Sequence, residues 1–422
     1  MSATPSDAST SPTGDSGDGD GASSERDLTR TEWQRLALLG LPTFGLALSI
    51  TAVSTYLPTV AREFTASAVV IGVIIGGEGV AALLLPIVVG AWSDRLRTRW
   101  GGRLPFILVG TPIAVAGLVV MGVAGSLGML AVAVAVFFAG YFIAYEPYRA
   151  LYPDLIPEEV AGRGQSTQAL WRGIGTGLAL LGGGLLLTLG RGAPFLVAAL
   201  VLLVSSALFV RLLLRAGLPD QKQGCHSIRD TVAEMAGLLT SDRPLRAFFF
   251  ANALWELALA ALKTFVVLWL TRGLGQSLSM AALSIGVAVP FILAGAALSG
   301  KLADRYGRQR VMFWAVVAFG TPMVVPLLTL SRPLIVAALP FIAIGGGVLM
   351  SLPYALLHPL MPAERHGALT GYYSVSRGLG LVLGPLLAGL AVAASGGILA
   401  STEGYAAMWA ICGVATLASL PL

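Results

Sequence analysis

A loop sequence that occurs twice between hydrophobic segments constrains this 422-residue chain more than any other feature. Residues 90–103 read GAWSDRLRTRWGGR and residues 300–310 read GKLADRYGRQR, each with a glycine, three residues, Asp-Arg and a basic run. A second element, PYRALYPDLIP at 147–157, returns as PYALLHPLMP at 353–362, and an Arg-Gly-x-Gly element follows each copy. Three elements in the same order in both halves predict a duplicated domain.

Composition places this duplicated domain in a membrane. The chain is 56% hydrophobic and only 12% charged, and a helix that spans the hydrocarbon needs roughly 20 mostly apolar residues. We therefore predict an all-α membrane protein with twelve transmembrane helices, arranged as two pseudo-symmetric six-helix bundles. The predicted spans lie at 34–58, 67–91, 104–124, 127–149, 165–189, 193–214, 247–271, 278–299, 311–330, 333–356, 367–392 and 404–422.

The basic residues predict the orientation of these spans. With a cytoplasmic N-terminus, 20 of the 27 Lys and Arg fall in inner segments, four in outer loops, and Arg172, Lys263 and Arg377 within spans. Because Lys and Arg favour cytoplasmic loops, we expect both termini in the cytoplasm and the chain in the plasma membrane. The net charge of +5 then reflects topology, and no binding of nucleic acid is expected.

The polar segments predict the domain boundaries. Residues 1–31 are rich in Ser, Thr, Asp and Gly and predict a disordered cytoplasmic tail, which lacks the apolar core of a cleaved signal peptide. The bundles are predicted at 32–214 and 247–422, with a cytoplasmic linker at 215–246. No Cys and His spacing indicates a metal site, and no nucleotide-binding GxxxxGK[ST] loop occurs. We expect no cofactor, no metal and no enzyme activity.

The repeated loops place a carboxylate beside a guanidinium where a helix ends. Such a carboxylate can pair with a basic side chain or face the N-terminus of a neighbouring helix. Contacts of this kind would hold the cytoplasmic side closed and would break when the halves move. Retention of the loops in the cytoplasm is the alternative, but two matching loops favour a gate. The predicted gating residues are Gly90, Asp94, Arg95, Gly300, Asp304 and Arg305.

The repeated loops and the six-plus-six plan resemble the major facilitator superfamily over about residues 33–422. GAWSDRLRTRWGGRLPFI at 90–107 and EPYRALYPDL from Glu146 resemble the sucrose-transporter group, in which glycine is usual at the Glu146 position. The Pro-Tyr-x-Ala-Leu-x-Pro pattern also resembles the glycoside–pentoside–hexuronide cation symporters, which have an acid or amide where this chain has Tyr145. Their first helix carries an acidic cation ligand, whereas the span at 34–58 has no acid. The resemblance implies a sugar symporter, and the missing acid argues against sodium coupling at that site and favours protons.

Charged residues inside the spans are the candidates for coupling, because each is costly in lipid if it is unpaired. Glu78 and Glu256 are the predicted proton carriers, since a carboxyl in a low-dielectric cavity changes protonation when a nearby arginine moves. Glu256 and Lys263 share a helix face but stand about 10 Å apart along the axis, so they are not expected to pair directly. Glu146 and Lys263 complete the predicted coupling set. The alternative is that these charges only brace the bundle, and for Glu146 the two interpretations are left even.

The third repeated element predicts the substrate site. It supplies a matched pair of arginines, and the resemblance to melibiose-type carriers implies that such arginines contact sugar. A guanidinium can donate paired hydrogen bonds to adjacent hydroxyls, and sugar rings stack on aromatic faces. The aromatic residues could equally serve packing. The predicted substrate-binding residues are Arg172, Arg377, Asn252, Trp255 and Tyr145.

These features predict a proton-coupled sugar symporter that works by alternating access, and the resemblance implies that it is a monomer. One alternative is a proton-coupled exporter of drugs or metabolites, because Gly380-x-x-x-Gly384-Pro385 resembles a glycine–proline motif of antiporters. In those proteins, however, the motif lies in helix five. A second alternative is a non-transporting sensor or assembly protein on the same scaffold. Such a protein would need neither buried acids nor a gating Asp-Arg pair. This chain has both, so transport is favoured over this alternative.

Overall fold

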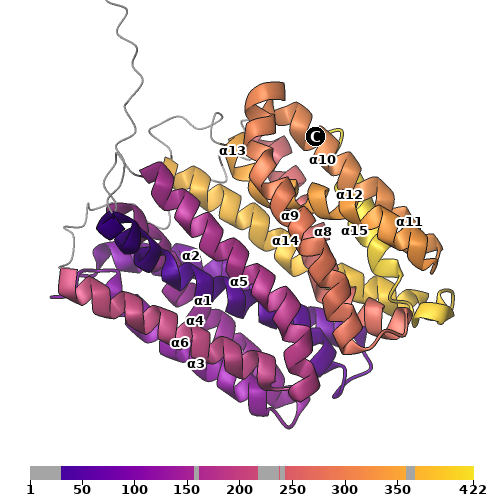
Figure 1. Cartoon of the computed structure of the whole chain (residues 1–422), viewed down its shortest axis with the longest axis horizontal. Helices are drawn as coiled ribbons and strands as arrows, with labels where there is room; N and C mark the ends of the chain where they lie inside the picture. Colours follow the sequence, from indigo (N-terminus) through magenta and orange to yellow (C-terminus); the bar gives the residue numbers. More distant parts are fainter. Residues whose placement is uncertain (1–29, 156–160, 217–236, 238–242, 358–365) are drawn as a thin grey trace, which may run out of the picture.

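A computed structural model describes residues 30–155, 161–216, 237, 243–357 and 366–422, which form helices joined by short connections (Figure 1). The predicted tail at 1–31 and the predicted linker at 215–246 lie almost entirely outside these residues. The N-terminal half has six helices. They are α1 (Arg30–Ala61), α2 (Ala68–Arg95), α3 (Leu104–Val123), α4 (Leu127–Asp154), α5 (Ala161–Leu189) and α6 (Ala193–Ala216).

The C-terminal half repeats this plan with more interrupted helices. The third span of this half bends through a 3-10 turn. The fourth helix, α12, is followed by a separate short helix. The elements are α8 (Arg243–Leu268), the π-helical turn η2 (Trp269–Gly273), α9 (Leu278–Tyr306), α10 (Arg308–Gly320), η3 (Thr321–Met323), α11 (Val324–Leu328), α12 (Arg332–Ser351), α13 (Pro353–Leu357), α14 (His366–Ser395), η6 (Ala400–Thr402) and α15 (Ala407–Leu417).

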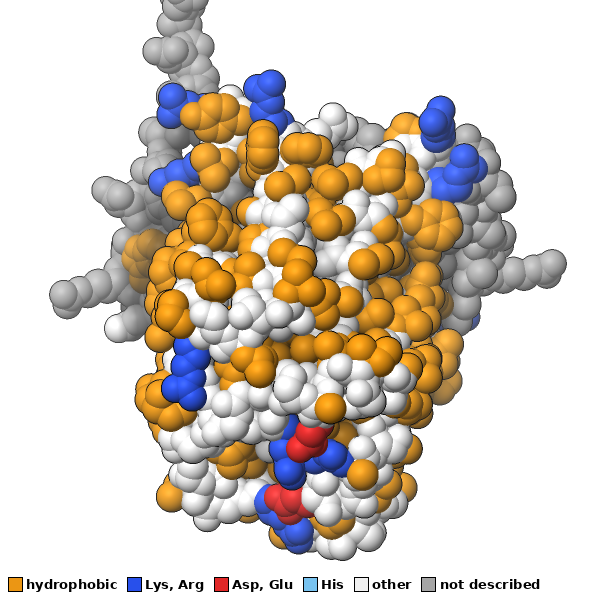
Figure 2. Space-filling view, turned by 90° about the vertical axis from the view of Figure 1, so that its right-hand side faces the viewer, with side chains coloured by type: hydrophobic (Ala, Val, Ile, Leu, Met, Phe, Trp, Pro, Cys, Tyr) orange, Lys and Arg blue, Asp and Glu red, His pale blue; other side chains and the backbone are white. Residues whose placement is uncertain are grey.

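The helices have the length and composition that a bilayer requires. Eleven spans of the described residues are long and apolar enough to cross a membrane, and the shorter apolar helix α15 occupies the predicted twelfth position. Hydrophobic side chains cover the middle of the face in Figure 2, between basic side chains at its upper edge and mixed charges at its lower end. The predicted all-α, twelve-helix membrane fold is confirmed.

Matching hydrogen bonds show the duplication at the level of single residues. Ser67 caps α2 by accepting from the Val70 amide, and Ser277 caps α9 by accepting from the Met280 amide, 210 positions later. Such caps satisfy amides that the first helical turn leaves free.

The repeated loop and the repeated Pro-Tyr element are bonded to each other in both halves. Arg103 donates to the carbonyl of Ala150 at 2.7 Å, and Arg308 donates to that of Ala355 at 2.8 Å. Both bonds span 47 positions in sequence. The basic run of each loop therefore holds the end of the fourth helix of its own half.

The two halves meet closely at one end of the molecule. We call the end with the two repeated loops the basic end and the opposite one the far end. Helix α2 packs on α14 and α5 packs on α9. A Cβ atom added to Gly79 would overlap the backbone nitrogen of Val382, and one added to Gly184 would overlap the side chain of Ala282. Small residues let membrane helices approach in this way.

An ion pair between the halves adds to this far-end contact. Arg62, after α1, lies 3.3 Å from Glu403 in the connection before α15. At the basic end nothing lies within 4 Å of a Cβ placed on Gly90 or Gly300. The conformation is therefore closed at the far end.

Gly79→Ala tests whether close helix approach closes the far end. The added methyl group meets backbone of α14, which cannot move aside as a side chain can, so we expect a loss of about 1–3 kcal/mol in stability of this conformation. We expect a longer distance between spin labels at the exposed positions Leu189 and Leu328, in the two halves. Gly77→Ala is the control, because nothing lies within 4 Å of its Cβ position. Equal distance distributions in both variants would contradict this account.

Candidate functional site

An ion pair joins the two halves near the middle of the membrane. The Glu78 carboxylate on α2 lies 3.6 Å from the Lys263 ammonium on α8, and its Oε2 accepts a 2.7 Å hydrogen bond from Ser54 on α1. The Glu78 side chain is 5% exposed and that of Lys263 is 30% exposed. Three helices from both halves thus converge on one buried carboxylate.

A second ion pair lies within the C-terminal half. Arg377 on α14 lies 3.4 Å from Glu256 on α8. Next to it, the fully buried Asn252 donates a 2.8 Å hydrogen bond to Ser376. Glu256 and Lys263 each have a partner on another helix, in agreement with the expectation that they do not pair with each other.

Two tyrosines of α4, in the N-terminal half, also belong to the cluster around these ion pairs. The Tyr145 ring stacks on Tyr141, with centroids 5.4 Å apart and planes inclined by 17°. Tyr141 interacts electrostatically with Glu78, Arg172 and Arg377. The cluster therefore receives side chains from α2, α4 and α5 as well as from α8 and α14.

Glu146 and Arg149 lie one turn apart on α4 and interact with each other. Glu146 also interacts with Arg377 of the opposite half. These electrostatic interactions connect Glu146 with the cluster.

Trp255 is engaged within the C-terminal half. Its side chain is buried, its indole N–H donates a 2.7 Å hydrogen bond to Ser419, and its ring packs edge-on against Phe248. Of the predicted substrate residues, Arg172, Arg377 and Tyr145 share electrostatic partners. Asn252 supports α14 next to Arg377, and Trp255 packs elsewhere.

The predicted gating residues lie at the helix ends where the sequence puts them. Arg95, Asp304 and Arg305 are exposed, and the Asp94 side chain lies outside the described residues. The Arg305 guanidinium lies 5.2 Å from the ring centroid of Tyr306. A gating role would need a second conformation, in which the basic end is closed.

Several residues that form the hydrogen bonds and ion pairs described above are absent from the residues predicted from the sequence. Ser54 carries no sequence signal, because its role depends on α2 lying beside α1. Arg103 and Arg308 do carry one, since both belong to the repeated basic runs and could have been paired with the repeated Pro-Tyr element. Arg62 and Glu403 are outer-loop residues whose proximity only the fold reveals.

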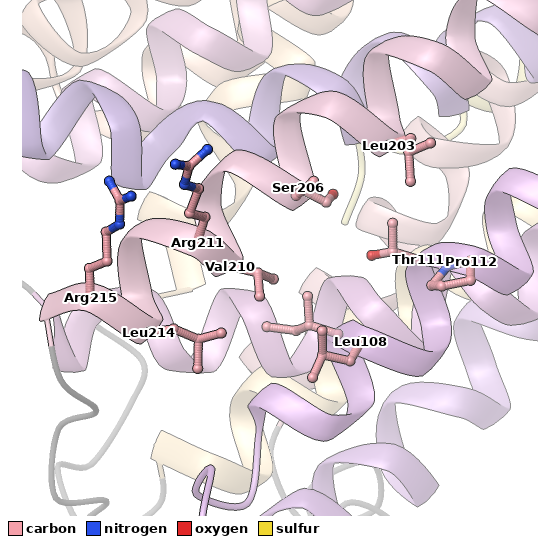
Figure 3. A pocket seen from close by; sticks show the side chains of 11 residues that line it. Leu108, Thr111, Pro112, Leu203, Ser206, Val210, Arg211, Leu214 and Arg215 are labelled. Carbon is pink, nitrogen blue, oxygen red and sulfur yellow. The ribbon is translucent and has the colours of Figure 1, made fainter.

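One cavity among the described residues is separate from this cluster. It has a volume of about 480 Å³ between α3 and α6, at the edge of the N-terminal half (Figure 3). Its lining is mostly apolar, with Leu108, Val210 and Leu214, and it also includes Arg211 and Arg215. Its apolar lining suits lipid chains rather than a polar solute. Among the described residues, no group of three or more His, Cys, Asp or Glu could hold a metal ion.

Lys263→Gln tests the ion pair between the halves. It leaves the buried Glu78 carboxylate without its cation, which costs about 3–5 kcal/mol for a fully buried pair. We expect about 1–3 kcal/mol here, because 30% of the Lys263 side chain is exposed. The apparent Tm of the purified protein should fall, and the double variant with Glu78→Gln should recover much of the loss. Lys301→Gln, at an exposed site, is the control, and an equal fall there would rule out the pair as the cause.

Comparison with known proteins agrees with this architecture. The chain is 34% identical to multidrug resistance protein 3 of Bacillus subtilis over 98 residues, or 23% of this chain and 19% of that protein. It is 26% identical to the sucrose transport protein SUC3 of Arabidopsis thaliana over 200 residues, 42% of this chain and 32% of that protein. The matched segments thus span less than a third of either relative.

Solved structures show the same fold over nearly the whole chain. A bacterial homologue of the human lysosomal transporter Spinster, in an inward-facing and occupied conformation, matches with a TM-score of 0.74 and 17% identity, over 94% of this chain and 96% of that chain. A D-xylose–proton symporter matches with a TM-score of 0.69 and 15% identity, over 92% and 96%. The sequence also matches the Major Facilitator Superfamily over residues 39–293 and 248–422. The chain therefore belongs to the Major Facilitator Superfamily.

Proposed function

We propose that this protein is a secondary transporter that carries a sugar-type solute together with a proton by alternating access. In this proposal the basic end faces the cytoplasm, as the excess of Lys and Arg there favours. A monomer in the plasma membrane suffices, since both halves of the site lie in one chain. The described conformation is then the one closed to the outside.

The ion pair between Glu78 and Lys263 carries the proposal. It links the halves through a carboxylate that is 5% exposed. Protonation removes the charge on Glu78 and with it the attraction to Lys263. Loss of the attraction favours separation of the halves at the far end, so proton binding is tied to the outward-open state. This makes Glu78 the proposed proton carrier, ahead of Glu256, whose partner Arg377 is in its own half.

The cluster also suits a hydroxylated solute. Arg377 and Arg172, from opposite halves, both interact electrostatically with Tyr141, and each guanidinium fork can donate paired hydrogen bonds to neighbouring hydroxyls. The stacked pair of Tyr141 and Tyr145 offers an aromatic surface beside them. A solute held by both arginines would contact both halves, so its binding depends on their relative position. Similarity to a sucrose transport protein supports the same solute class.

The repeated loops complete the proposed cycle. When the basic end closes, Asp94 with Arg95 and Asp304 with Arg305 would come between the halves and take over the role that Arg62 and Glu403 have at the far end.

A proton-coupled exporter of drugs or metabolites is the second candidate. Its support is the similarity to a multidrug resistance protein and the Gly380–Pro385 segment. That segment packs closely on α8, since a Cβ on Gly380 would lie 2.6 Å from the Ala253 carbonyl oxygen. This packing explains the glycine without any role in export, so symport remains the stronger proposal.

Glu78→Gln tests the coupling. We expect that protein in liposomes accumulates a labelled disaccharide when the proton gradient points inward, and that a protonophore abolishes accumulation. Because glutamine cannot exchange a proton, the variant should only equilibrate the disaccharide, while exchange of internal for external solute continues. Glu256→Gln is the matched comparison and should retain gradient-driven accumulation.

Three results would contradict the proposal. Accumulation by Glu78→Gln equal to wild type would exclude Glu78 as the proton carrier. Failure of folded wild-type protein to move any sugar-type solute would exclude the symporter. Extrusion of dyes or drugs in exchange for protons would establish the exporter instead.

A further inference from the structure

Six charged side chains lie toward the middle of the spans of the described residues, three acidic and three basic. They are Glu78, Glu146, Glu256, Arg172, Lys263 and Arg377. Arg149 lies two residues from the end of its span.

Each of the three acids has a basic partner. Glu78 pairs with Lys263 and Glu256 with Arg377, and Glu146 interacts first with Arg149, one turn away on α4. The side chain without an acidic partner among the described residues is Arg172. Ionisable side chains within membrane spans are rare and commonly mark substrate or ion pathways.

Arg172 faces the interior rather than lipid. Ile174, Leu178 and Leu185 are exposed on the opposite side of α5. Thr176, one turn after Arg172 on the same side, bonds Thr51 of α1 at 3.5 Å. Arg172 also interacts with Tyr141, a member of the central cluster. Its side chain is nevertheless exposed, so it is accessible to a solute between the halves.

The duplication identifies the missing partner. Gly175, three residues after Arg172, lies against the Phe44 carbonyl, the Ala47 Cβ and the Leu48 nitrogen of α1. Gly380, three residues after Arg377, lies in the same order against the Ala253 carbonyl, the Glu256 Cβ and the Leu257 nitrogen of α8. The three contacted residues are each shifted by 209 positions between the halves and the glycine by 205, so Ala47 occupies the place that Glu256 occupies in the C-terminal half.

We propose that the solute itself supplies the acid that Ala47 does not. It carries one carboxylate, or a comparable singly charged anionic group, which binds the Arg172 guanidinium. This inference rests on the proposed function and narrows its solute class to hydroxylated organic acids. A guanidinium fork and a carboxylate are geometrically matched for two parallel hydrogen bonds.

The charge of such a solute predicts how transport responds to voltage. One singly charged anion and one proton together carry no net charge, so each cycle transfers none. Symport of the anion is expected to follow a pH gradient and to ignore the membrane potential, whereas a neutral sugar with a proton would respond to both.

Binding tests the inference without any transport assay. The probes are gluconate against sorbitol and lactobionate against lactitol, each pair an acid and its matching alcohol. We expect at least one acid to raise the Tm of purified wild-type protein and its alcohol to bind about tenfold or more weakly, as for a lost charged hydrogen bond. Arg172→Gln should remove the preference for the acid, and Arg332→Gln, at an exposed site, should keep it.

Ala47→Glu is the sharper variant, because it recreates in the N-terminal half the pair of Glu256 and Arg377. The new carboxylate should occupy Arg172, so the variant should be as stable as wild type and should not bind the acids. A folded variant that binds them like wild type would overturn the inference. Equal binding of acid and alcohol, no binding of either acid, or an acid preference that survives Arg172→Gln would also overturn it.

Uptake into liposomes separates this inference from the proposed function. Acid uptake driven by a pH gradient and unchanged by a valinomycin-imposed potential supports both. Acid binding that depends on Arg172, without any proton-driven uptake, keeps the inference and overturns symport. Proton-driven uptake of the alcohols alone keeps symport and overturns the inference.

Discussion

The contact between the Glu78 carboxylate and the Lys263 ammonium connects the parts of this structure that must move apart. Each residue lies on a different half, and removal of both charges from water is compensated only while the two stay together. Ser54 adds a hydrogen bond from a third helix, so the carboxylate is held by α1, α2 and α8. The close approach of α2 to α14 and of α5 to α9 keeps water from this region at the far end. A pair of this kind is stable when closed and becomes weak once its acid is protonated, which is the property that a coupled transporter requires.

Much of the architecture could be predicted from the sequence because it depends on short patterns. Apolar runs of about 20 residues gave all the spans, and the two Asp-Arg loops gave the duplication. The spacing of Glu256 and Lys263 was enough to exclude a direct pair on one helix. The true partners could not be predicted, since each lies on another helix and depends on how the helices are arranged.

Trp255 also shows that the sequence does not predict contacts between helices. Its position beside Glu256 in sequence made it a candidate for sugar stacking, but neighbours in a helix point about 100° apart. Its ring therefore packs against Phe248 and its N–H reaches Ser419, while Glu256 meets Arg377. Adjacency in sequence predicts a shared helix turn and does not predict a shared site.

The duplication preserved the scaffold and changed the charges. The caps at Ser67 and Ser277, and the bonds from Arg103 and Arg308, recur because both halves need the same helix ends. The acids do not recur: with the 210-residue shift that relates Gly90 to Gly300, Glu78 corresponds to Ala288, and Glu256 corresponds by its contacts to Ala47. Two symmetric halves with identical charges would repel across the interface or neutralise themselves internally. Because each acid is present in only one half, Glu78 binds Lys263 across the interface, and Arg172 has no acidic partner among the described residues.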